Sequence, residues 1–214
     1  GCPSTSDTFT FFPGYIADSR PIPLFASVYH DYLGTEGPGL LCLGASVSPQ
    51  QVAYAYAAGF VFGTRLGTAD VGFFQRHRAG STTPAEDLAM QYAGKVARWQ
   101  ARLHPTLLLG ELLRPPAVTG ATLSVAIGGN PAEVPAVLGG TFRQDSTVLA
   151  VFTNPTPTSR TVEVNWSGIP APAGGVTEVT LAGENSSSGG LGALATLELP
   201  AGEVRAFRWT ATGP

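Results

Sequence analysis

The sequence predicts an α/β segment followed by an all-β segment, and three observations carry this prediction. Residues 23–28 form a short apolar run that breaks into aromatic and ionisable side chains at 29–32, as a buried parallel strand does where its end meets a site. Two helix-start signatures follow, at Ser48 and Thr83. Beyond Pro105 the apolar residues recur with a period of two, which is typical of antiparallel strands.

The composition excludes several classes of function. Of the 214 residues, 43% are hydrophobic and 13% are charged, and the formal net charge is −3. This is ample apolar material for a core, but it provides no basic surface for nucleic acid or for an anionic membrane. No run approaches the roughly 18 apolar residues of a membrane span. We expect neither a nucleic acid nor a membrane as partner.

The sequence also gives no sign of a cofactor or a metal. The histidines at 30, 77 and 104 lack metal-ligand spacing. Cys2 and Cys42 permit one disulfide but form no Cys-x-x-Cys pair. A phosphate loop, a dinucleotide fingerprint and a serine-hydrolase elbow are likewise missing from the sequence. We expect no cofactor and no metal site.

The first helix begins at a capping box. Residues 48–51 supply an N-cap Ser, a Pro at the first helical position and a Gln that reaches back to the cap. The pattern predicts a helix over 49–58 that Gly59 ends. The next apolar run, 60–65, is predicted to be a second short buried strand.

The second helix has the clearest periodicity in the chain. Residues 83–86 form another capping box, and apolar positions then step by four, four, three and four at Leu88, Tyr92, Val96, Trp99 and Leu103. The prediction is a helix over 84–103, ended by His104-Pro105 because Pro disfavours helical geometry in the residue before it. Residues 22–103 therefore read as strand, helix, strand, helix.

The remainder predicts an antiparallel β-sandwich of about eight strands. Clusters of Pro, Gly, Asn and Ser separate the runs at the spacing of such a fold. The predicted domains are 1–104 and 105–214, and 186–190 is expected to be a mobile loop. The expected strands are 106–114, 121–127, 134–142, 146–153, 160–167, 176–182, 193–199 and 202–210.

Three segments carry a family resemblance. They are Pro-Leu-Phe-Ala-Ser-Val-Tyr-His-Asp-Tyr at 23–32, Gly-Glu-Leu-Leu-Arg-Pro-Pro at 110–116 and Ala-Val-Phe-Thr-Asn-Pro-Thr at 150–156. In this order they resemble the C-terminal part of a bacterial family of glycoside-hydrolase-like proteins. That family carries a domain of unknown function, distantly similar to α-galactosidase and endo-α-N-acetylgalactosaminidase barrels. The likeness covers nearly all of 20–210, although its motifs are short.

The resemblance implies the C-terminal piece of a (β/α)8 barrel followed directly by a sandwich. Residues 22–32 and 60–65 would be the seventh and eighth barrel strands, and 49–58 and 84–103 the last two helices of the outer ring. Strands one to six have no counterpart here, and the catalytic carboxylates of related retaining barrels usually lie on strands four and six. The implied function is the C-terminal portion of a glycoside hydrolase acting on oligo- or polysaccharides, without catalytic residues of its own. Its implied partners are a carbohydrate and the missing N-terminal barrel half.

The candidate substrate-binding residues stand at the ends of the two predicted barrel strands. Tyr29 and Tyr32 offer aromatic surfaces for a sugar, and His30 and Asp31 offer polar groups. His30 and Asp31 are adjacent, so an extended strand points them to opposite sides; an Asp that caps nearby amides and a packed His are the structural alternative. Arg65 is equivalently placed, either for a sugar oxygen or for a structural ion pair.

Other polar residues have a structural interpretation. Asp70 and the basic cluster 76–78 are expected in solvated loops. Glu111 is expected on the exposed side of a strand, since hydrolysis needs two carboxylates and no partner is identifiable. His104 stands at a predicted helix C-terminus, where a cation is favourable.

A non-catalytic carbohydrate-binding or structural module is the alternative function. The helical half would then be a small α/β cap, and the sandwich would bind a glycan or a protein. Trp166 and Trp209 are the candidate contact residues. Their alternation with apolar neighbours indicates burial instead, and two buried tryptophans would weaken this alternative.

Overall fold

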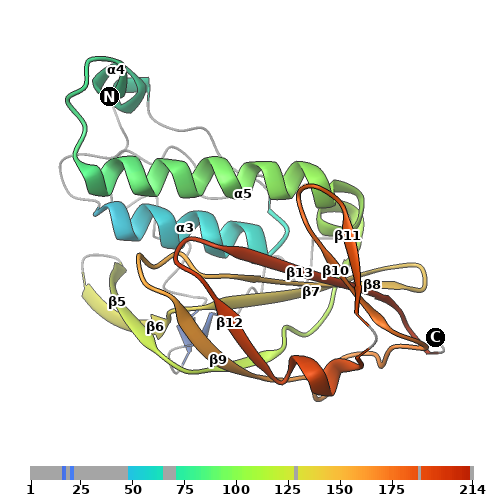
Figure 1. The fold of residues 1–214 in the computed structure, drawn as a ribbon. Coiled ribbons are helices and arrows are strands. Elements are labelled where there is room, and N and C mark those ends of the chain that lie inside the picture. The colour runs from blue at the N-terminus through green and yellow to red at the C-terminus, as the bar shows by residue number, and fades with distance from the viewer. Residues whose placement is uncertain are drawn as a thin grey trace.

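A computed structural model describes residues 16–17, 20–21, 48–64, 71–127, 130–187 and 189–212. The strand expected over 22–32 lies outside these residues. The described part is mainly antiparallel sheet with a few helices (Figure 1). The helices are α3 (Pro49–Val61), α4 (Val71–Arg78), α5 (Pro84–Leu109) and the 3-10 helix η2 (Leu191–Leu194). The strands are β1 (Ile16–Ala17), β2 (Arg20–Pro21), β3 (Glu111–Leu112), β4 (Ala117–Thr119), β5 (Thr122–Ile127), β6 (Asn130–Pro135), β7 (Leu138–Gln144), β8 (Thr147–Thr153), β9 (Arg160–Asn165), β10 (Val176–Val179), β11 (Glu184–Ser187), β12 (Thr196–Leu199) and β13 (Val204–Thr210).

A six-stranded sheet forms the middle of the molecule. Its strand order is β11-β10-β13-β8-β7-β3, and every pairing in it is antiparallel. A three-stranded sheet, β12-β9-β4, packs on one face through the core formed by β8, β9, β12 and β13. Helices α3 and α5 pack on the other face through a second core (Figure 1). Because both faces are covered, β8 is buried along nearly its whole length.

Strand β13 shows how the two cores are separated. Val204 and Ala206 belong to the core beneath the helices, whereas Phe207 and Trp209 belong to the core between the sheets. Successive side chains of a strand point to opposite faces, so the period of two read in the sequence is confirmed here.

Helix α3 begins as predicted but ends later. Ser48 and Gln51 form both hydrogen bonds of the capping box. The predicted end at Gly59 is wrong, and so is the strand predicted from Phe60, because the helix runs to Val61. Gly63, at φ 66°, ends it in a Schellman motif: its N–H donates to Phe60 O and the Thr64 N–H donates to Gly59 O. A short apolar run does not by itself distinguish a strand from a helix that continues.

Helix α5 also begins as predicted and continues further than expected. Thr83 and Glu86 form the capping box, but the helix passes through Pro105 and ends at Leu109, so its predicted end at 103 is wrong. Leu107 is fully buried two residues beyond the proline. Its burial offsets part of the roughly 3 kcal/mol that Pro costs in a helix interior.

Helices α3 and α5 lie side by side and run in the same direction (Figure 1). Near their starts, Gln50 of α3 donates to Pro155 O, and the Tyr92 hydroxyl of α5 bonds that of Thr153 at 2.5 Å. Beyond the end of α3, Thr64 O accepts from the Gln100 side chain of α5 at 2.7 Å. The starts of the two helices therefore lie at one end of the pair and the end of α3 lies beside the later part of α5, as expected for parallel helices.

Several strand predictions are confirmed and others are corrected. Strands β5, β8, β9 and β13 fall within the runs predicted for them. The run 106–114 is the end of α5 followed by β3, and 134–142 covers the end of β6, a bend and most of β7. Strands β4 and β11 were not predicted, and β11 takes up the start of the expected loop at 186–190.

Candidate functional site

The substrate-binding residues predicted from the sequence lie outside the described residues. They are Tyr29, His30, Asp31, Tyr32 and Arg65. Asp70, Cys2 and Cys42 lie outside them as well. The sugar subsite predicted at 29–32 therefore stays a prediction, whereas the strand expected to place Arg65 is replaced by the end of a helix at 60–61.

The most extensive buried polar cluster described surrounds Asn154, which is fully buried. Its Nδ2 donates to three carbonyl oxygens, those of Thr158, Leu199 and Pro200, at 2.8–3.0 Å. Its Oδ1 accepts from the Thr156 N–H and from the Thr156 hydroxyl. The side chain thereby joins the loop after β8 to the turn between β12 and β13, and it is a structural clamp with no exposed reactive atom.

A second chain of contacts connects helix α5 to the same turn. The Tyr92 hydroxyl bonds Thr153 Oγ1. The Thr153 hydroxyl in turn lies 3.5 Å from Glu203 O. The Lys95 ammonium forms an ion pair with the Glu203 carboxylate. Burial raises the pKa of the Tyr92 phenol above its ordinary range. Tyr92 is therefore a neutral, fixed anchor at neutral pH.

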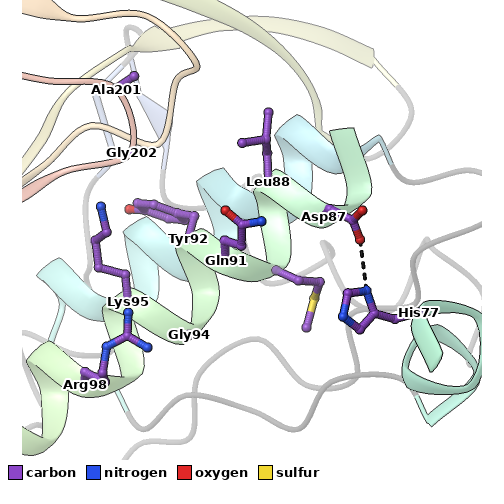
Figure 2. A pocket seen from close by; sticks show the side chains of 11 residues that line it. His77, Asp87, Leu88, Gln91, Tyr92, Gly94, Lys95, Arg98, Ala201 and Gly202 are labelled. Carbon is purple, nitrogen blue, oxygen red and sulfur yellow. Dashed lines mark hydrogen bonds and ion pairs between the residues drawn. The ribbon is translucent and has the colours of Figure 1, made fainter. Parts of the chain in front are cut away.

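Helix α5 and this turn enclose a groove of about 530 Å³. Leu88, Tyr92 and Lys95 line it from the helix, and Ala201 and Gly202 line it from the turn between β12 and β13 (Figure 2). Leu88 is 57% exposed, although the four-residue spacing predicted it to be buried. The groove therefore joins an uncovered aliphatic side chain to charged groups.

One end of the groove is closed by helix α4. The basic cluster 76–78, expected in a loop, is the last turn of this helix. His77 Nδ1 lies 3.0 Å from Asp87 Oδ1 (Figure 2), and Arg76 pairs with Glu86 at 3.3 Å. Hydrogen bonds from the Thr83 backbone and side chain lower the pKa of Glu86, and Arg76 lowers it further. These groups hold α4 against the start of α5.

Three other carboxylates of the described part form surface ion pairs. Glu111 is exposed, as expected, and accepts from Arg143 at 2.5 Å. Glu178 pairs with Arg205, and Glu184 pairs with Arg208 and Arg102. Within residues 48–64, 71–127, 130–187 and 189–212 no cluster of three or more His, Cys, Asp or Glu could hold a metal. The arrangement here supports binding and positioning of a ligand, without a catalytic constellation.

The two tryptophans proposed as contact residues of a binding module are packed inside. Trp209 is 3% exposed and donates to Pro170 O, and Trp166 is partly buried and donates to Leu194 O. Their rings meet edge to face at 6.0 Å, and Phe152 adds another edge contact to Trp166. The alternative function that needs them exposed is thereby weakened.

Sequence reasoning missed both the Asn154 clamp and the groove. Asn154 stands in one of the three segments that carry the resemblance, and an Asn-Pro-Thr turn sequence was its available signal. The groove left a weaker signal, a glycine at 94 in the interior of a helix. Its walls come from segments about 110 residues apart in the sequence, and no local pattern brings them together.

No family model matches the chain, and no curated protein matches its sequence. Several solved structures similar to it are glycoside hydrolases. A maltogenic α-amylase from Thermotoga neapolitana is 11% identical with a TM-score of 0.44, and the match covers 77% of this chain and 37% of the enzyme. An α-amylase from Geobacillus thermoleovorans is 9% identical with a TM-score of 0.42, over 99% of this chain and 53% of that one. A β-L-arabinopyranosidase from Geobacillus stearothermophilus is 8% identical with a TM-score of 0.36, over 88% and 41%.

This chain spans about a third to a half of the length of these enzymes. At such identities and TM-scores, the likeness transfers no substrate and no activity to it. No helix among the described residues is long and apolar enough to cross a membrane.

Proposed function

We propose that this chain is the C-terminal portion of a glycoside hydrolase, made of the C-terminal part of a barrel and an accessory β-sandwich. The intact enzyme would cleave glycosidic bonds of an oligo- or polysaccharide with two carboxylates supplied by the preceding barrel strands. Tyr29, His30, Asp31 and Tyr32, with Arg65, would contribute to the sugar subsite. Domains 1–104 and 105–214 would be the barrel part and the sandwich.

The parallel arrangement of α3 and α5 carries this proposal. Two helices joined by a short loop pack antiparallel, whereas parallel neighbours need a connection that returns to the starting end. In a β/α barrel a strand of each unit provides that return, and consecutive outer helices are parallel neighbours. The connection between α3 and α5 includes residues 65–70, which lie outside the described residues, and the predicted strand over 22–32 would precede α3 in the same way.

The burial of α3 supports the same placement. Residues 51–61 are buried around the whole circumference of the helix, which a helix packed on a single sheet does not require. A helix between a barrel wall and an accessory sheet would be covered in this way. The amphipathic α5, exposed on one side, fits an outer position.

An activity comparison tests the proposal. The 214-residue chain should be inactive on aryl glycosides, and a protein extended upstream by the missing strands should be active. Activity of the short chain at the level of the long one would overturn the assignment of catalysis to the preceding segment. Inactivity of both on a broad panel of aryl glycosides and polysaccharides would overturn the glycoside hydrolase assignment.

Substitutions in the extended protein test the subsite. We expect His30→Ala and Asp31→Asn to raise KM at least about tenfold, because each removes a hydrogen bond to a sugar hydroxyl. His104→Ala and Asp145→Asn are the matched controls, since both residues are exposed in the described part. If the control pair and the subsite pair change KM equally, residues 29–32 do not contact the substrate.

A further inference from the structure

We propose that the groove between α5 and the β12–β13 turn binds an extended peptide segment that carries an aliphatic side chain and, about five residues away, a carboxylate. This inference is independent of the proposed catalytic role. It rests on the groove's exposed leucine, on its uncompensated arginine and on the distance between them.

The aliphatic end of the groove is formed by Leu88, and Met90 lines the groove from another side of the helix. Leu88 is 57% exposed, and Met90 is half-buried with its other side against the helical core. An uncovered leucine offers apolar surface that a partner side chain would remove from water. The aromatic ring that lines the groove, Tyr92, is 5% exposed and has its hydroxyl engaged, so the groove provides no stacking platform for a sugar (Figure 2).

One cationic side chain of the groove has no ion-pair partner among the described residues. His77 lies against Asp87, and Lys95 is paired with Glu203. Arg98 is exposed and forms no ion pair with any residue in the described part of the chain. The charge that complements this groove is therefore a single carboxylate near Arg98.

The geometry sets the length of the ligand. Leu88 and Arg98 are ten residues apart on one helix, which corresponds to about 15 Å along its axis. An extended peptide covers this distance with about five residues. Gly94 lies between them and has no side chain to fill the groove; the atom nearest to a Cβ built there would be Arg98 Nη1, at 3.9 Å.

Two residues make the test unusually direct. Met90 is the only methionine of the chain, and Lys95 is its only lysine. Labelling the methionine methyl group with ¹³C therefore gives one NMR signal from inside the groove. The probe is acetyl-Leu-Ser-Thr-Ser-Glu-amide, and the matched control peptide ends in Gln in place of Glu.

The Met90 signal should shift saturably with the Glu peptide, with a Kd on the order of 1 mM. The Gln peptide should bind about fivefold more weakly. In Arg98→Gln the two peptides should bind alike, whereas Arg102→Gln, one turn further along and paired with Glu184, should keep the difference. Leu88→Ala should weaken both peptides about fivefold, and an unchanged urea midpoint would show that each variant is folded.

Three results would overturn the proposal. The first is no shift of the Met90 signal up to about 10 mM peptide. The second is equal affinity for both peptides in the unsubstituted protein. The third is an equal shift caused by maltotriose, or by raising the protein concentration alone; these would mean that a sugar or a second copy of the chain occupies the groove.

Discussion

Helices α3 and α5 start with the same local device and end in different environments. Each has a Ser or Thr N-cap, a Pro in the first turn and a reciprocal side chain at the third position. Helix α3 is then buried on all sides for eleven residues, whereas α5 keeps one side exposed and ion-paired to the sheet. The comparison shows that the start of a helix is set by local hydrogen bonds, while its end and its buried surface are set by the layers packed on it.

The largest difference between the helices should be the loss of folding stability when one side chain of each is truncated to alanine. Phe60 in α3 is fully buried, so Phe60→Ala should lower the free energy of unfolding by about 3–5 kcal/mol, through lost burial and the cavity that it leaves. Leu109→Ala at the end of α5 is the control, because Leu109 is 65% exposed, and it should change stability by less than about 0.5 kcal/mol. Urea unfolding followed by circular dichroism measures both. Equal losses would show that α3 is no more central to the core than α5.

Alanine substitutions at two glycines should change the stability in opposite directions, one at Gly140 of β7 beside α3 and one at Gly94 within α5. A Cβ on Gly140 would overlap the carbonyl oxygen of Val61 in α3, so Gly140→Ala should destabilise the protein by about 2–3 kcal/mol. A Cβ on Gly94 in α5 would make only an ordinary contact, 3.9 Å from Arg98 Nη1, so Gly94→Ala should stabilise the protein by about 0.5–1 kcal/mol, since Ala favours helix. Thermal unfolding of the two variants in parallel is the measurement. A neutral Gly140→Ala would show that α3 does not press on β7 as described.

Much of the fold followed from patterns that local physics explains. The capping boxes at Ser48 and Thr83 and the alternation along β13 were predictable, because their hydrogen bonds and side-chain directions depend on residues close in sequence. The continuation of α5 through Pro105 was not, because it depends on the burial of Leu107 against strands far along the chain. For the same reason the sequence predicted that α3 ends at Gly59, whereas the helix continues to Val61 and is ended by Gly63.

The candidate sites also divide into one that the local sequence predicted and one that depends on segments far apart in the chain. The subsite at 29–32 was predicted from a strand that ends in aromatic and ionisable residues, and it stays a prediction. The groove on α5 could not be predicted, since it exists only where the turn at Ala201–Gly202 meets the helix. Leu88 illustrates the limit: its spacing assigned it to the core, but the sheet that covers Tyr92 does not extend over it.

Removing the hydroxyl of one buried tyrosine in each helix should give a smaller difference in stability. The Tyr92 hydroxyl of α5 bonds Thr153, whereas the Tyr54 hydroxyl of α3 is buried with no hydrogen-bond partner among the described residues. Tyr92→Phe should therefore cost about 1 kcal/mol, and Tyr54→Phe should be neutral or stabilising by up to about 1 kcal/mol, because it removes an unsatisfied polar group. Chemical denaturation at neutral pH distinguishes them. A loss for Tyr54→Phe as large as that for Tyr92→Phe would mean that this hydroxyl has a partner in solution.

The smallest predicted difference lies in the two capping boxes, whose third-position residues are Gln51 in α3 and Glu86 in α5. At neutral pH, Ser48→Ala and Thr83→Ala should each cost about 1 kcal/mol. Bonds from Thr83 lower the pKa of Glu86 below its ordinary value of 4.5. A carboxyl group with a lowered pKa stabilises the folded state above its unfolded pKa and loses that contribution as the pH falls through its folded pKa.

Acidification should therefore weaken the box of α5 and leave the neutral box of α3 unchanged. Between about pH 6.5 and pH 3.5, the cost of Thr83→Ala should shrink while that of Ser48→Ala stays constant. Glu86→Gln, which gives α5 the same kind of box as α3, should make the cost of Thr83→Ala independent of pH. Urea midpoints of the single and double variants at both pH values measure this. If Thr83→Ala costs the same at both pH values, the Glu86 carboxylate contributes nothing to the cap, and the two helices start with equivalent boxes.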